Sequence, residues 1–187
     1  MKKTILALLA LVLTAGMTGL VGSPAEAATA KRSTTKTGYT QVVVAPAVND
    51  LIGSAGITPA PVQGAKAGAF KGTLAAKFPI TGYSLRGIRI KHSGGLNLSA
   101  GASTITVSNF NIDLARLRVS GNVNGTVGNV GRVDLFKVRA SDRRDLGLVK
   151  LTLTKTAADA LNATFGVNAF AENATFGYAT PKPLSRF

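Results

Sequence analysis

The chain has 187 residues, of which 45% are hydrophobic and 16% charged, with one histidine, no cysteine and no tryptophan. The lack of cysteine excludes disulfide scaffolds, thiol catalysis, zinc ribbons and iron–sulfur ligation, and a lone His92 excludes multi-histidine metal centres. The 22 Lys and Arg residues outnumber the 8 Asp and Glu residues, which gives a net charge of +14, yet the apolar fraction is that of a folded chain. We expect a compact, strongly basic domain that is not an enzyme.

Residues 1–27 have the pattern of a secretory signal peptide. Lys2 and Lys3 precede an apolar stretch at 5–21, and Ala25-Glu26-Ala27 supplies a small-x-small cleavage site. An uncleaved membrane anchor is the alternative, because the stretch approaches the length of a spanning helix, but internal threonines and glycines favour cleavage. We expect a bacterial protein that is secreted or associated with the cell envelope, with no transmembrane segment after cleavage.

The high charge belongs to the domain rather than to the signal peptide. Removing residues 1–27 leaves 20 basic and 7 acidic residues, a net charge of +13. Residues 28–38 are rich in Thr, Lys and Ala without periodicity, which predicts a flexible lead. Residues 39–187 are then predicted to form a single domain, long enough to bury roughly two-thirds of its unfolded surface.

The domain is predicted to begin with a strand. Residues 39–45 are rich in β-branched side chains and end at Pro46, where we expect a break. Residues 53–72 are rich in Gly, Ala and Pro, which predicts a long loop or short edge strands.

Clear strand periodicity follows. In residues 85–92, Ile88 and Ile90 share one face, and Arg89 and Lys91 share the other. His92 has the parity of the isoleucines, so its side chain is predicted to point toward the apolar side. The next segment, Ser93-Gly94-Gly95, predicts a turn. Further alternating runs predict strands within 96–98, 105–114, 117–123, 133–138, 151–153 and 176–179.

Two local features modify this pattern. The apolar parity changes after Val107, which predicts a bulge near Ser108 or Asn109. Residues 156–165 have apolar side chains at helical spacing after a capping-box-like Thr156-x-x-Asp159, which predicts a helix. The sequence therefore predicts a mainly β fold, an antiparallel β-sandwich-like domain with one α-helix in its C-terminal half.

Catalytic motifs have little support. A serine triad would have to use His92, but the chain has no Gly-x-Ser-x-Gly segment, and a lone inward histidine is more often a core residue. The overlapping Ser-x-x-Lys and Lys-Thr-Gly patterns in 33–38 lie in the predicted lead. Asp142 and Asp145 are separated by two arginines, which favours a solvated loop.

The basic side chains point to an anionic partner. Strand geometry places several of them on solvent faces, and we assign an anion-binding role to five: Arg86, Arg89, Lys91, Arg116 and Arg118. Wall polymers, lipid headgroups or a carboxylate-bearing ligand fit better than nucleic acid, because no aromatic stacking platform accompanies the charge and the protein is predicted to be exported. The alternative is that the charge only keeps a secreted protein soluble.

Several stretches carry a family resemblance. Residues 90–98 and 105–113, then 151–161 and Phe170, resemble the HtaA-type domain of exported bacterial heme-uptake proteins. The resemblance implies a mainly β fold with helical segments. Heme-binding members use a tyrosine near the domain start as iron ligand, a histidine before a glycine-rich turn as its partner, and a later tyrosine, and the corresponding residues are Tyr39, His92 and Tyr178.

Two functional hypotheses follow. The first is a secreted, non-enzymatic HtaA-like protein that binds heme, with Tyr39, His92 and Tyr178 as cofactor-binding residues, or a related anionic ligand. The alternative is a structural or adhesion protein of the cell envelope that binds anionic wall polymers through its basic surface. No metal site apart from heme iron and no nucleic-acid partner is predicted.

Overall fold

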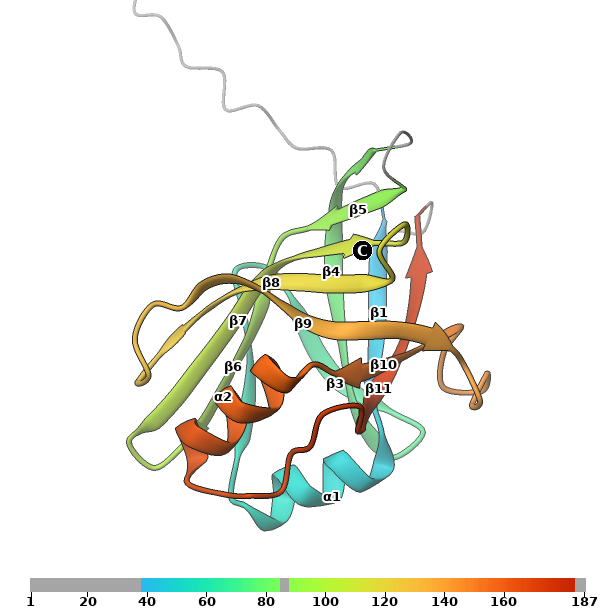
Figure 1. Ribbon diagram of the computed structural model, residues 1–187. Helices are drawn as coiled ribbons and strands as arrows, with labels where there is room; N and C mark the ends of the chain where they lie inside the picture. The colour runs from blue at the N-terminus through green and yellow to red at the C-terminus, as the bar shows by residue number, and fades with distance from the viewer. Residues whose placement is uncertain (1–37, 85–87, 184–187) are drawn as a thin grey trace, which may run out of the picture. The chain divides into compact units, whose positions relative to one another are not determined.

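The computed structural model describes residues 38–84 and 88–183. The predicted signal peptide, Arg86 and nearly all of the predicted lead lie outside the described residues. The strands are β1 Tyr39–Val44, β2 Thr58–Val62, β3 Lys66–Phe70, β4 Thr73–Ser84, β5 Arg89–His92, β6 Gly95–Ala100, β7 Ser103–Asp113, β8 Arg118–Gly125, β9 Gly131–Ala140, β10 Val149–Leu153 and β11 Thr175–Lys182. The helices are α1 Pro46–Ser54 and α2 Lys155–Phe165 (Figure 1).

The strands form a closed antiparallel barrel, not the predicted sandwich. Eight strands follow one another in the order β7-β5-β4-β1-β11-β10-β9-β8, and β8 pairs back onto β7. β6 and β2 extend the sheet from β7, and β3 pairs with β4. Both architectures alternate inward and outward side chains along each strand, so periodicity predicted the strands but not their closure.

The long strand β7 makes this closure possible. One edge of β7 pairs with β6 through residues 103–108 and with β5 through residues 111–113, while the other edge pairs with β8. The register with β8 shifts between Ser108 and Asn111, and Asn109 has a φ of 52°. The predicted bulge is therefore confirmed, and it lies where the strand changes partners.

The barrel interior is apolar. Phe78 of β4 and Phe110 of β7 pack edge to face with their ring centroids 4.8 Å apart. The predicted inward orientation of His92 is confirmed, because its side chain lies among these residues and only 5% of its surface is exposed. The predicted turn after it is wrong, because β5 and β6 both pair antiparallel with β7 and therefore run in the same direction, although Gly94 has a φ of 81° that favours glycine.

The region after β1 differs from its prediction. Pro46 begins α1 instead of a break, because a proline at the first helical position sacrifices no hydrogen bond. α1 buries Val48 and Ile52. The predicted loop at 53–72 contains the edge strands β2 and β3, and β2 tolerates two prolines because its outer edge pairs with no strand of the described residues.

The predicted helix at 156–165 is confirmed as α2, but its N-cap is Thr154. The Thr154 hydroxyl accepts a hydrogen bond from the Ala157 amide at 3.2 Å. Asp159 pairs instead with Lys155, one turn earlier in the same helix. No helix within residues 38–84 and 88–183 is long and apolar enough to span a membrane.

Candidate functional site

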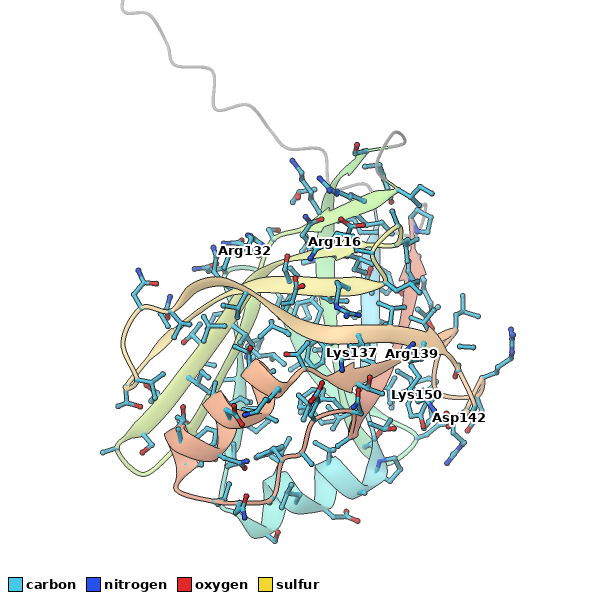
Figure 2. The ribbon with its side chains drawn as sticks, in the orientation of Figure 1. Arg116, Arg132, Lys137, Arg139, Asp142 and Lys150 are labelled. Atoms are coloured by element: carbon cyan, nitrogen blue, oxygen red, sulfur yellow. The ribbon has the colours of Figure 1, made fainter. Side chains whose placement is uncertain are left out.

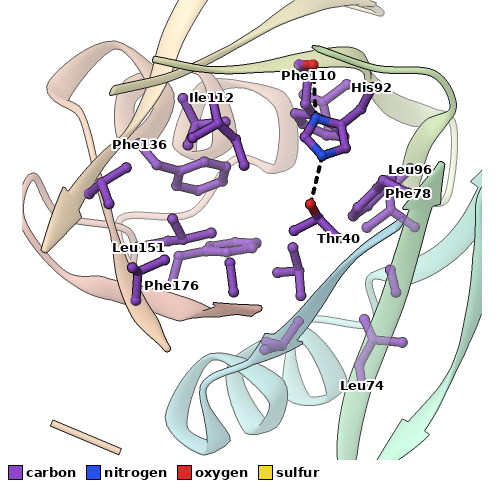
Figure 3. Close-up of a pocket in the computed structure, with 18 of the residues that line it drawn as sticks. Thr40, Leu74, Phe78, His92, Leu96, Phe110, Ile112, Phe136, Leu151 and Phe176 are labelled. Carbon is purple, nitrogen blue, oxygen red and sulfur yellow. Dashed lines mark hydrogen bonds between the residues drawn. The ribbon is translucent and has the colours of Figure 1, made fainter. Parts of the chain in front are cut away.

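His92 makes two hydrogen bonds inside the barrel (Figure 3). Its Nδ1 lies 3.2 Å from the Phe110 carbonyl oxygen, and its Nε2 lies 2.7 Å from the Thr40 hydroxyl oxygen. Because a carbonyl oxygen can only accept, Nδ1 carries the proton, and Nε2 accepts the hydroxyl proton of Thr40. Both ring nitrogens are therefore engaged by groups of the barrel wall.

The environment of His92 keeps its ring neutral. Burial lowers the pKa of His92 to about 4, and backbone hydrogen bonds with Phe110 and Ile90 offset only part of this effect. The neutral imidazole of β5 is hydrogen-bonded through both nitrogens, to Thr40 of β1 and to Phe110 of β7, and so links the three strands. In this conformation it has no lone pair to offer a metal ion.

The apolar cavities are small, and His92 lines one of them. One of about 80 Å³ lies between His92 and the aromatic side chains of Phe110, Phe136 and Phe176, and another of about 50 Å³ lies against Leu161 of α2. A protein cavity of about 150 Å³ accommodates benzene. Neither space holds a porphyrin, so a ligand of that size has to bind outside the barrel.

The two candidate tyrosines do not reach His92. Their neighbours Thr40 and Ala179 line the interior, and because successive strand residues point to opposite faces, Tyr39 and Tyr178 belong to the outer face of the wall, where both are nevertheless buried, at 8% and 6% exposed. Lys77 and Lys182 place their ammonium groups 5.0 and 5.7 Å from the ring centroid of Tyr39. The residue that contacts His92 is therefore Thr40.

Tyr178 lies on the barrel wall opposite the segment that follows β9. Burial, and then hydrogen bonding to Asp142, raises the pKa of Tyr178, so its phenol stays protonated. The Cα of Gly147 comes so close that an added Cβ would lie 2.9 Å from the Tyr178 Cβ. These contacts lie on the outer face of the wall, whereas His92 points to the interior.

A polar groove of about 300 Å³ lies on the outer face of the barrel. We call it the arginine groove, and it is lined by Arg89, Asn111, Asp113, Arg116, Arg118, Ser120, Arg132, Val133 and Asp134. Figure 2 labels two of these residues, Arg116 and Arg132. Strand register builds it, since Arg89 of β5 pairs with Asp113 of β7, which pairs with Arg118 of β8. Outward positions of adjacent strands thus bring together arginines that are distant in the sequence.

Two aspartates orient the guanidinium groups of the groove. Arg89 Nε lies 2.9 Å from Asp113 Oδ2, and Arg116 Nη2 lies 3.3 Å from Asp134 Oδ2. A hydrogen bond from the Arg116 amide, followed by that of Arg89, lowers the pKa of Asp113 and keeps it ionised. Four guanidinium groups face two carboxylates, so the groove keeps an excess of positive charge.

Comparisons with known proteins address the fold. No family model and no curated protein sequence matches the chain. The heme binding protein HtaB from Corynebacterium glutamicum superposes with a TM-score of 0.52 and 13% identity, over 78% of this chain and 93% of that one. The C-terminal domain of HtaA from the same organism gives 0.50 and 12%, over 75% and 93%. This domain has an HtaA-like fold. The resemblance seen in the sequence is thereby confirmed for the fold.

Within the HtaA-like domain, three of the five predicted anion-binding residues lie together. Arg89, Arg116 and Arg118 line the arginine groove, and Lys91 lies on the same outer face of β5, paired with Asn111 of the groove. Arg86 lies outside the described residues.

Sequence reasoning did not single out two residues that complete these sites. Arg132 reaches the groove because β9 pairs with β8 at Asn122, a register that the sequence does not show. Thr40 shares the inward parity of Val42 and Val44, but the sequence did not show it, because the equally apolar Val43 has the opposite parity.

Proposed function

We propose that this protein is a non-catalytic binding protein that holds an anionic ligand in the arginine groove, with heme as the leading candidate. The observation that carries the proposal is the convergence of Arg89, Arg116, Arg118 and Arg132 on one groove. Guanidinium groups form paired, charge-assisted hydrogen bonds with carboxylates and phosphates. The groove thus suits a ligand with one or two such groups.

The arginines are accessible and partly ordered. The side chains of Arg116 and Arg89 are 64% and 49% exposed, so a ligand can approach them from solvent. Arg132 is anchored by its Nη2, which donates to the Asn109 carbonyl at 2.8 Å. Groups held before binding lose less conformational entropy when a ligand arrives.

The arginine groove matches the carboxylates of heme but not its iron. The two carboxylates of heme match the arginines, and two structures with the same fold are described as a heme binding protein and a domain of HtaA. The groove-lining residues are basic, acidic, amide, hydroxyl and aliphatic, which suits carboxylates, but they include none of the His, Cys, Met or Tyr side chains that ligate heme iron. Iron ligation by Tyr39, Tyr178 or His92 stays a prediction from the family resemblance, and in this conformation only Tyr39 and Tyr178 belong to the outer wall.

A hemin titration of the purified domain tests the proposal. We expect a saturable Soret change, weakened about tenfold or more in Arg118→Ala/Arg132→Ala. The matched control is Arg139→Ala/Arg144→Ala, which removes the same charge away from the groove. Equal losses in the two variants, or no saturable change in the wild type, would contradict the proposal.

The same titration distinguishes the roles of the three residues that the family resemblance assigns to heme binding. Tyr39→Phe and Tyr178→Phe remove only the phenol oxygen, and His92→Gln removes the imidazole. A loss of the Soret change in either tyrosine variant would place the porphyrin against the outer wall at that residue. A loss in His92→Gln with both tyrosine variants unaffected would contradict binding on the outer face.

An anionic wall polymer is the second candidate, because the basic surface continues beyond the groove. Arg132 and Arg139 are exposed on β9, whereas Lys137 between them is 17% exposed and pairs with Glu172 (Figure 2). An extended polyanion could contact this strand as well as the groove, as an adhesion or structural protein of the envelope would require. We expect salt-sensitive binding to isolated envelopes for this function, and binding that is absent or unaffected by salt would contradict it.

Both candidates place the protein outside the cytoplasm. We propose that residues 1–27 direct export and are cleaved after Ala27. The N-terminal residue of the exported protein tests this directly: Ala28 is expected, and an intact Met1 would contradict cleavage.

A further inference from the structure

Two adjacent turns at one end of the barrel expose large apolar side chains. Ile88 precedes β5 and is 56% exposed, and Leu117 lies in the β7–β8 turn and is 47% exposed. The turns are neighbours, because the Leu114 amide donates to the Ile88 carbonyl at 3.1 Å. Neither Ile88 nor Leu117 lines the arginine groove or either interior cavity.

Both residues have a backbone conformation that favours glycine. The φ angles are 43° at Ile88 and 52° at Leu117. Among the described residues, the other non-glycine residues with positive φ are polar: Gln63, Lys71, Asn109 and Asn173. For a β-branched isoleucine this conformation is a clear outlier. Large apolar side chains that are strained and exposed at once are not explained by packing, and such features concentrate at binding surfaces.

Positive charge surrounds these two side chains. Arg89 follows Ile88, and Arg116 and Arg118 flank Leu117, with exposed side-chain fractions of 49%, 64% and 34%. Apolar tips set among arginines match a membrane surface, where acyl chains lie just below anionic phosphates. We propose that this end of the barrel docks on an anionic lipid membrane, with Ile88 and Leu117 inserted among the headgroups.

A membrane fits this surface better than a protein partner. Stable protein interfaces bury about 800 Å² on each side and have a continuous apolar centre, whereas two apolar residues separated by arginines offer little such area. Peripheral membrane binding needs only shallow apolar insertion combined with electrostatic attraction. The proposal goes beyond the anionic-ligand function, because it adds Ile88 and Leu117, which do not line the groove, to arginines that do.

Glycine substitutions separate membrane binding from folding. Ile88→Gly/Leu117→Gly removes both apolar side chains and suits the positive φ, so we expect thermal stability to be kept or raised. Co-sedimentation with vesicles of equal parts phosphatidylcholine and phosphatidylglycerol should weaken about tenfold or more. The matched control is Val127→Ser/Val130→Ser on the β8–β9 hairpin, where the side chains are 42% and 44% exposed; it should bind as the wild type does.

Fluorescence provides a second readout, since the chain has no tryptophan. Leu117→Trp should show a blue-shifted emission with the anionic vesicles and none with phosphatidylcholine alone, whereas Val127→Trp should show no shift with either. Failure of the wild type to bind the anionic vesicles, or undiminished binding by Ile88→Gly/Leu117→Gly, would overturn the proposal. Hemin titration of the glycine variant should match the wild type, so failure of the membrane proposal is distinguishable from failure of the anionic-ligand function.

Discussion

The two sides of the barrel wall at β5 have opposite chemistry. His92 points inward, where Thr40 and Phe110 satisfy both ring nitrogens and burial keeps the ring neutral. Arg89 points outward into the groove, where guanidinium groups outnumber carboxylates. A single short strand thus separates a dry region that stabilises the fold from a charged region that is available for binding. Substitutions on the two sides should therefore have different consequences.

The largest effect on stability is expected from Phe110→Ala. Phe110 is 9% exposed and packs against Phe78, and its loss would leave a cavity in the barrel interior. We expect the free energy of unfolding to fall by about 3–5 kcal/mol, measured by urea denaturation. A fall below about 1 kcal/mol would show that the interior can collapse around the gap, which would weaken the contrast between the two sides.

The second largest effect is a pH dependence from His92. Its folded-state pKa is about 4, against 6.5 for the unfolded chain, so only the unfolded state takes up a proton between these values. The stabilisation from the neutral ring is complete above pH 6.5 and is lost as the pH falls toward 4, a loss of about 3 kcal/mol. Urea midpoints measured across this range test it.

The control for the pH experiment is His92→Gln, which cannot titrate. The aspartates also contribute below about pH 5, so the quantity to compare is the difference between the wild type and this variant. That difference should shrink as the pH falls from 6.5. Parallel pH profiles for the two proteins would contradict a buried, neutral imidazole.

A smaller effect on stability, with a larger one on binding, is expected in the groove. Arg118→Ala/Arg132→Ala should change the free energy of unfolding by less than about 1 kcal/mol, because solvent-exposed ion pairs contribute little to folding. Its affinity for an anionic ligand should fall about tenfold, and the salt dependence of binding should decrease. If this variant unfolds, the two arginines stabilise the fold, and the prediction that they serve ligand binding is wrong.

A small, local effect on stability, with none on binding, is expected at the cap of α2. Thr154→Ala removes the acceptor for the Ala157 amide and the donor to the Asp134 carbonyl. We expect destabilisation of about 1 kcal/mol by urea denaturation. Thr156→Ala is the control, because Thr156 does not cap the helix. An equal loss of stability in this control would contradict capping by Thr154 and would favour the capping box predicted at Thr156.

Local pattern predicted much of this fold. Alternation gave the inward orientation of His92, the bulge at Ser108 and Asn109, and most strands, because each depends on neighbouring residues alone. The Pro46 helix was missed because proline both ends strands and begins helices. Closure of the barrel was missed because β1 pairs with β4 and with β11, strands that are distant from it in the sequence, and long-range packing decides such pairings.

The candidate site was less predictable for the same reason. Charge alone identified Arg89, Arg116 and Arg118, but their meeting with Arg132 depends on the register of four strands. The order Tyr39, His92, Tyr178 matched the family, yet strand parity places Thr40 beside the histidine and both tyrosines on the other face. Chain order carries no information on which face of a strand a residue occupies.

Nuclear magnetic resonance can test directly that the ligand binds outside the barrel. The chain has one histidine, so its imidazole signals are unambiguous, and a diamagnetic gallium protoporphyrin can stand in for heme. Titration with this ligand should shift the guanidinium Nε–H signals of Arg89, Arg116, Arg118 and Arg132 in a saturable manner, while the His92 ring signals stay in place. Large shifts at His92 with unchanged arginine signals would contradict binding in the arginine groove.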